Sequence, residues 1–177
     1  LYLNLMEAHT PYDPPEAYKN VNVTHGQGLA ETISKGDDGS VDTEAVRQAY
    51  DDCVRYLSDV YEEIFSELTD EFDHIITVSD HGELLGEHGG WMHGYGLYSE
   101  LTHVPLVVSG PGIEDKTTDD LVSLLDVHAT ALDATTGESS PRGRSLLDET
   151  QRDECLTEYH GFTPQKRATL RHSAVPE

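Results

Sequence analysis

The sequence predicts an α/β fold with a largely parallel sheet flanked by helices. Short β-branched apolar runs alternate along the chain with segments whose apolar residues recur at steps of three and four. Polar stretches rich in glycine and proline end several of these runs. The 177 residues suffice for one ordinary domain with a buried core.

The expected elements begin with a short strand over residues 1–6. Three prolines between residues 11 and 15 forbid a helix interior or a central strand there, so His9 is expected at the strand's end. Residues 26–40 have the composition of a loop or lid. Asp42 is suited to cap a helix with one apolar stripe. That stripe consists of Val46, Tyr50, Cys53, Leu57, Val60, Ile64 and Leu68.

Further elements follow in the same alternating order. Strands are expected over 75–78, 104–108, 154–159 and 166–175, a helical turn over 98–101, and a strand passing into a helix over 121–136. Gly137 is expected to end that helix. Strands that alternate with helices favour an α/β sheet.

The net charge of −23 makes a polyanionic partner improbable on physical grounds, so nucleic acid binding is not expected. Acids spread along the chain with few lysines indicate a halophilic archaeal source. No apolar run approaches the roughly 20 residues of a membrane span. Cys53 and Cys155 lack a CxxC spacing and are expected to be packing or surface residues. The sequence leaves the compartment and the oligomeric state open.

The stretch SDHGELLGEHGGWMH, residues 79–93, carries the candidate chemistry. Asp80 and His81 come directly after the expected strand at 75–78, where ligands bind in open α/β sheets. Together they offer an oxygen and a nitrogen to one divalent cation, and Gly82 lets the chain turn away. Taken alone, the pair favours the simpler interpretation, in which Asp80 caps the next turn and His81 is a solvated loop residue. Glu83 and the acids after it are expected to belong to the solvated acidic surface.

The longer string SDHGELLGEHGGWMHGYGLYSELTHVPLVVSGPG, with MEAHTPYDPP before it and VSLLDVHATALDATTG after it, resembles the sulfatases of the alkaline phosphatase superfamily. The resemblance implies a mixed α/β sheet between helices, a bound Ca²⁺ ion and a formylglycine made from a Cys or Ser. It implies that Asp80 and His81 are metal ligands. It also implies that His9 faces the substrate sulfate or its leaving oxygen.

His93 departs from the family pattern, because most sulfatases carry at this place a lysine that contacts the sulfate. A histidine can still donate a hydrogen bond, but it is shorter and titrates near neutral pH. We therefore expect His93, with His9, to serve as a catalytic residue. The alternative for His9 is a turn residue whose ring bonds to backbone near Pro11, and a role outside the site stays open for His93.

The family's nucleophile motif, C/S-x-P-x-R, is absent from the 177 residues, and so is its first pair of metal-binding aspartates. The chain is therefore expected to be the C-terminal part of a sulfatase-type catalytic domain, inactive alone, with the formylglycine upstream. The expected substrate is a small anionic sulfate ester. Two alternatives stay open: a phosphonate monoester or phosphodiester hydrolase of the same superfamily, and a non-catalytic binding relative.

Overall fold

A computed structural model describes residues 1–21, 42–148 and 152–161. The expected loop over 26–40 and the expected strand over 166–175 lie outside these residues. The chain divides into two compact units. Among the described residues, the first unit contains 1–21, 42–67, 83–96, 160 and 161, and the second contains 68–82, 97–148 and 152–159.

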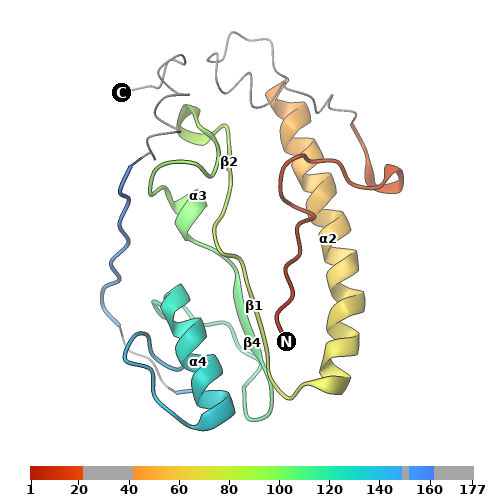
Figure 1. The fold of residues 1–177 in the computed structure, drawn as a ribbon. Helices are drawn as coiled ribbons and strands as arrows, with labels where there is room; N and C mark the ends of the chain where they lie inside the picture. Colours follow the sequence, from red (N-terminus) through yellow and green to blue (C-terminus); the bar gives the residue numbers. More distant parts are fainter. Residues whose placement is uncertain (22–41, 149–151, 162–177) are drawn as a thin grey trace. The chain divides into compact units, whose positions relative to one another are not determined.

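The first unit is built on the long helix α2 (Thr43–Glu71), along which the N-terminal segment runs (Figure 1). The Asp42 carboxylate accepts a hydrogen bond from the backbone N–H of Ala45 at 3.1 Å, which confirms the predicted cap. Four side chains form the buried core of this unit: Tyr12, Val46, Ala49 and Cys53. The first part of the predicted apolar stripe thus packs against the segment that carries Tyr12.

A buried carboxylate on α2 also fixes the short 3₁₀ helix η1 (Glu16–Tyr18) and the residues after it. Asp52 is fully buried and accepts hydrogen bonds from the backbone and side-chain nitrogens of Asn20 at 2.6 and 2.8 Å. Arg55 donates to the same carboxylate at 2.8 Å. Burial alone would raise the pKa of Asp52, but these donors outweigh it and lower the pKa.

A small antiparallel hairpin completes the described part of the first unit. Strand β2 (Leu84–Leu85) pairs with β3 (Trp91–Met92), and η2 (Glu87–Gly89) connects them. The Arg47 side chain on α2 donates from Nε to the carbonyl oxygen of Leu85 at 2.8 Å. This bond ties the hairpin to the helix that carries the core.

In the second unit, β1 (Ile75–Val78) pairs antiparallel with β4 (Leu106–Ser109), in a register that sets Ile75 opposite Ser109 (Figure 1). The short helix α3 (Ser99–Thr102) precedes β4, and α4 (Leu124–Thr136) follows it. Ser123 begins α4 with a capping box. Gly137 ends it in the left-handed region at φ 68°.

The strand at 75–78 and the helix starting after Asp42 agree with the sequence prediction, and α3, β4 and α4 lie within a few residues of their predicted places. Three predicted strands are wrong. Residues 121–123, expected as a strand that leads into the helix, form no strand, and α4 begins directly after them. Residues 1–6 pair with no strand in the described ranges, and Leu1 and Tyr2 are 83% and 84% exposed. Residues 154–159 form no strand and are exposed throughout, because they have no neighbouring strand in the described residues to complete a ladder.

The predicted parallel sheet is not seen among the described residues, where both ladders are antiparallel. The β1–β4 pair holds two of the predicted buried runs, yet Val78 and Val107 are 38% and 54% exposed. Within the described ranges, no helix has both the length and the apolar character needed to cross a bilayer.

Candidate active site

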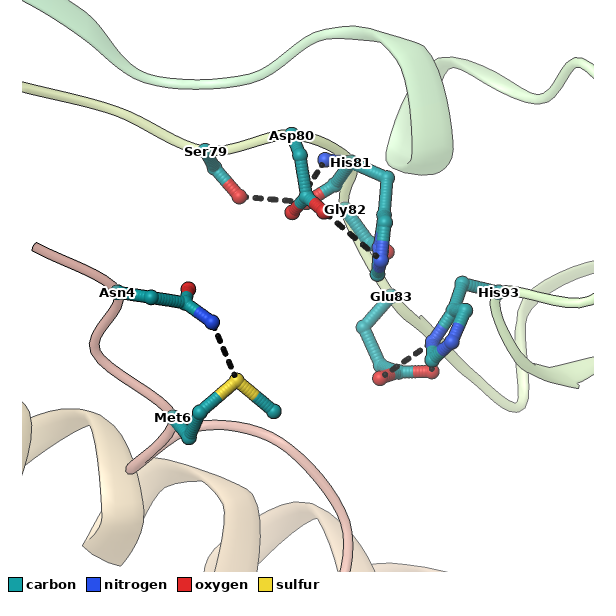
Figure 2. Close-up of polar contacts among 8 residues, drawn as sticks. All are labelled: Asn4, Met6, Ser79, Asp80, His81, Gly82, Glu83 and His93. Atoms are coloured by element: carbon teal, nitrogen blue, oxygen red, sulfur yellow. Dashed lines mark hydrogen bonds and ion pairs between the residues drawn. The ribbon is translucent and has the colours of Figure 1, made fainter. Parts of the chain in front are cut away.

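The Asp80–His81 pair lies on the loop that directly follows β1, as predicted. The loop is held at both ends: Ser79 N–H donates to the Pro105 carbonyl at 3.3 Å, and Gly82 N–H donates to the Leu101 carbonyl at 2.9 Å. The Ser79 hydroxyl also donates to the His81 carbonyl at 2.6 Å (Figure 2). These bonds fix the backbone of both candidate ligands.

Gly82 is required where the loop meets α3. A Cβ atom at this position would lie 1.9 Å from the backbone carbonyl oxygen of Glu100. Only a residue without a side chain allows this approach. The glycine of the SDHG string is therefore explained by packing of the loop onto α3.

The ring of His81 is oriented by its own backbone. Nδ1 lies 2.9 Å from the Gly82 carbonyl oxygen, and because a carbonyl can only accept, Nδ1 carries the proton. The lone pair of the neutral ring is then on Nε2, the nitrogen nearer Asp80. Nε2 lies 3.7 Å from Asp80 Oδ2. A backbone carbonyl behind the ring is the common outer-shell partner of a metal-binding histidine.

The donor set of this pair fits a divalent cation. Two atoms 3.7 Å apart can both contact one ion that lies about 2.4 Å from each. Both side chains have solvent exposure, 88% for Asp80 and 39% for His81. Among the described residues, no group of three or more His, Cys, Asp or Glu could hold a metal. The pair would thus form part of a coordination shell.

In the first unit, the structure brings together the other two predicted site residues. The rings of His9 and His93 lie with their centroids 5.6 Å apart, although 84 residues separate them in the sequence. His9 follows a turn closed by its N–H to the Met6 carbonyl at 3.0 Å. Its Nδ1 donates to the Thr10 carbonyl at 2.7 Å, the backbone contact expected of a turn histidine. That bond leaves Nε2 of the exposed ring as the nitrogen for another partner.

Glu83 corrects the sequence prediction, which assigned it to the solvated acidic surface. Its side chain is only 7% exposed, and both carboxylate oxygens lie near His93 Nδ1, at 3.2 and 3.3 Å (Figure 2). The buried Tyr12 hydroxyl donates to the same carboxylate. Burial, followed by the charge of Glu83, raises the pKa of Tyr12 well above its ordinary value. A buried acid in an acid-rich chain gave no sequence signal of its own.

The two cysteines match their predicted roles as packing and surface residues. Cys53 is fully buried in the core of the first unit, and Cys155 is exposed. Burial, with a further contribution from the Asp52 carboxylate, raises the pKa of the Cys53 thiol to about 11. A thiol in this environment is a poor nucleophile at neutral pH.

The site residues thus form two groups, each described within its own unit: Asp80 with His81, and His9 with His93 and Glu83. The acid–histidine pair lies on the loop that follows a strand, and it offers an oxygen and a nitrogen ligand to one cation. The sulfatase family model matches residues 1–137. The chain therefore belongs to the sulfatase family, which implies an alkaline phosphatase-like α/β fold.

Curated relatives agree with this assignment. The chain is 36% identical to Arylsulfatase K of Homo sapiens over 104 residues, which is 49% of this chain and 19% of the relative. It is 42% identical to Arylsulfatase K of Bos taurus over 60 residues, 33% of this chain and 11% of the relative. It is 30% identical to "Uncharacterized sulfatase YidJ" of Escherichia coli over 83 residues, 45% of this chain and 17% of the relative.

The chain thus spans less than a fifth of the length of these curated relatives. No solved structure matches it.

Proposed function

We propose that this chain supplies a metal-binding pair and two substrate-facing histidines to a sulfuric ester hydrolase. The observation that carries the proposal is the Asp80–His81 pair, held behind β1 with Oδ2 and Nε2 3.7 Å apart. It stands in a chain that the sulfatase family model matches. The names of the curated relatives support a sulfate ester, with an aryl ester as the first substrate to test.

Asp80 and His81 would hold a divalent cation, for which Ca²⁺ is our first choice. The carboxylate is a typical Ca²⁺ ligand, and the imidazole also suits softer ions, so the choice of metal needs a direct comparison. When bound, the cation would stabilise negative charge on the sulfate oxygens. The backbone bonds of Ser79 and Gly82 hold its two ligands in place.

His9 and His93 would contact the substrate and move protons. A positioned imidazole can donate to a sulfate oxygen or exchange a proton with the leaving oxygen, and proton transfer of this kind contributes about 10²- to 10⁴-fold to rate. Neither Cys53 nor Cys155 stands in a C-x-P-x-R motif. The proposal therefore requires a formylglycine nucleophile supplied from outside these 177 residues.

The test uses the complete protein and the variant Asp80→Asn, which keeps the shape of the side chain and removes its charge. We expect Ca²⁺ affinity, measured by calorimetry beside Mg²⁺, Mn²⁺ and Zn²⁺, to fall by about 100-fold or more. Hydrolysis of a chromogenic aryl sulfate should fall with it. Asp73→Asn is the matched control, because Asp73 is exposed and also borders β1.

The outcomes separate the candidate functions. Activity on the sulfate ester that depends on Asp80 supports the proposal. Turnover of a phosphonate monoester or phosphodiester with the same leaving group, without turnover of the sulfate, would move the assignment to that class of hydrolase. Absence of metal binding and of turnover in the unmodified protein would identify a non-catalytic relative.

A further inference from the structure

Glu83 is a buried carboxylate whose partners are unusual for this acidic chain. Asp52 and Asp126, the fully buried aspartates among the residues that the structure describes, each accept hydrogen bonds from an arginine. Glu83, with its side chain 7% exposed, is instead bonded to the His93 imidazole and the Tyr12 hydroxyl. Glu83 therefore holds a histidine ring, which can gain or lose a proton, whereas the two aspartates hold guanidinium groups, which are always charged.

The carboxylate determines which nitrogen of His93 carries a proton. An ionised carboxylate only accepts hydrogen bonds, and both of its oxygens lie 3.2–3.3 Å from Nδ1. Nδ1 must therefore be protonated, and Nε2 is the second nitrogen of the ring. A carboxylate behind a histidine also restricts the plane of the ring, as in acid–histidine pairs of hydrolases.

Tyr12 makes this carboxylate rigid. Its hydroxyl donates to Glu83, and its ring packs in the core formed with Val46, Ala49 and Cys53. Tyr50 contacts the same ring edge-on, with centroids 5.3 Å apart. The position of Glu83 is thus fixed by the core of the first unit.

The backbone at His93 is also constrained. The preceding residue, Met92, adopts φ 66°, a left-handed conformation that is rare for a residue with a side chain. Such conformations persist where the surrounding structure imposes them, and they are frequent beside functional side chains. The backbone conformation before His93 therefore constrains the direction of its side chain independently of the contact with Glu83.

We propose that Glu83 is a positioning residue, which fixes the Nδ1-protonated tautomer and the ring plane of His93 so that Nε2 meets the substrate. What His93 does to the substrate rests on the proposed function, whereas the tautomer does not. Tyr12 supports the carboxylate from the core. The chain of contacts runs from the core through Tyr12 and Glu83 to the ring of His93, whose side chain is 25% exposed.

A double-mutant cycle on sulfate ester hydrolysis by the complete protein tests the first part. Glu83→Gln should lower kcat/KM by about 10- to 100-fold and leave Ca²⁺ affinity unchanged. In a His93→Ala background, Glu83→Gln should change kcat/KM by less than about twofold further. Glu83 and His93 act together, so the loss of either residue already removes their shared contribution. Glu83→Asp, which keeps the charge, should lose less than Glu83→Gln.

Glu87→Gln is the matched control for this cycle. The Glu87 carboxylate lies in the same hairpin but accepts a hydrogen bond from the backbone N–H of Leu85 at 2.6 Å. Its effect, whatever its size, should be the same with and without His93. Equal effects of Glu83→Gln in both backgrounds would overturn the positioning role and leave Glu83 a structural acid.

A spectroscopic measurement separates this proposal from the proposed function. Nitrogen-15 NMR of labelled histidine, assigned with His93→Ala, should show a protonated Nδ1 in the unmodified protein and a mixture of tautomers in Glu83→Gln. An Nε2-protonated neutral ring in the unmodified protein would overturn the proposal. A protein that hydrolyses no sulfate ester but shows the expected spectra would refute the sulfatase function and uphold the action of Glu83 on His93.

Discussion

Replacing Asp126 by asparagine should lower the free energy of local unfolding of α4 by about 3 kcal/mol. The Asp126 side chain is 1% exposed and occupies the first turn of α4. Oδ2 accepts from the Ser123 N–H at 2.7 Å and from Arg152 Nη1 at 2.8 Å. Oδ1 accepts from the Arg144 N–H and from Arg152 Nη2, both at 2.8 Å. One carboxylate thus joins the cap of α4 to two segments that follow the helix.

The magnitude follows from what asparagine loses. The amide nitrogen of asparagine cannot accept a hydrogen bond. Each oxygen of Asp126 accepts one bond from a backbone N–H and one from the Arg152 guanidinium, so one bond of each kind is lost whichever oxygen the nitrogen replaces. A neutral hydrogen bond contributes about 1 kcal/mol and one between charged groups about 2 kcal/mol. The loss therefore amounts to about 3 kcal/mol, at the lower end of what breaking a buried ion pair costs.

Hydrogen exchange of the α4 backbone amides in the complete protein measures this loss locally. A change of about 3 kcal/mol corresponds to about a 100-fold faster exchange of the amides in residues 124–136. Asp119→Asn is the control, because Asp119 is exposed in the same unit and a surface change of this kind stays within about 0.5 kcal/mol.

The effect should depend on pH in a direction that the contacts fix. Burial alone would raise the pKa of Asp126, but the hydrogen bonds from Arg152, Arg144 and Ser123 outweigh it, and the pKa is lowered. The ionised carboxylate therefore stabilises the fold fully above the unfolded value of about 3.9, and this contribution is lost as the pH falls through the folded pKa. Two results would refute the reasoning. The α4 amides of Asp126→Asn could exchange within threefold of the rate in the unmodified protein at pH 7. Alternatively, the difference in exchange rate between the two proteins could fail to narrow below about pH 4.

Two further predictions concern the loop behind β1 and the cysteines. Gly82→Ala places a Cβ 1.9 Å from the Glu100 carbonyl oxygen, so we expect a loss of about 3 kcal/mol in urea unfolding and weaker Ca²⁺ binding. Gly112→Ala, with no atom within 4 Å, should cost only about 1 kcal/mol for its left-handed backbone. A thiol reagent at pH 8 should modify Cys155 rapidly and Cys53 only on unfolding; equally fast modification of both would contradict the burial of Cys53.

The elements that the sequence predicted correctly are those with strong local signals. The run IITV is β-branched and bounded by polar residues, and it forms β1 over Ile75–Val78. Asp42 caps the start of α2 and Gly137 ends α4, and both effects depend only on backbone groups within a few residues. The run at 154–159 was also expected to form a strand, but it remains exposed and has no partner ladder among the described residues.

The site was predictable only as far as its chemistry is local. Asp80 and His81 are adjacent, and the strand before them is evident from the sequence. The contact between the His9 and His93 rings depends on how α2 and the hairpin are packed, which no spacing reveals. Glu83 could not be told from the other acids, because its hydrogen-bond partner Tyr12 lies 71 residues earlier in the sequence.

The buried acids of this chain differ in the kind of partner that holds them. The chain has 11 lysines and arginines against 34 acids, and two arginines are bonded to the fully buried Asp52 and Asp126. Both of these aspartates join segments distant in the sequence, a structural role that a permanent cation serves well. Glu83 is hydrogen-bonded to a tyrosine and to a histidine, whose proton can lie on either ring nitrogen. The choice of partner therefore separates Glu83 from the two structural acids, and it is the reason to look for the effect of Glu83 in catalysis rather than in stability alone.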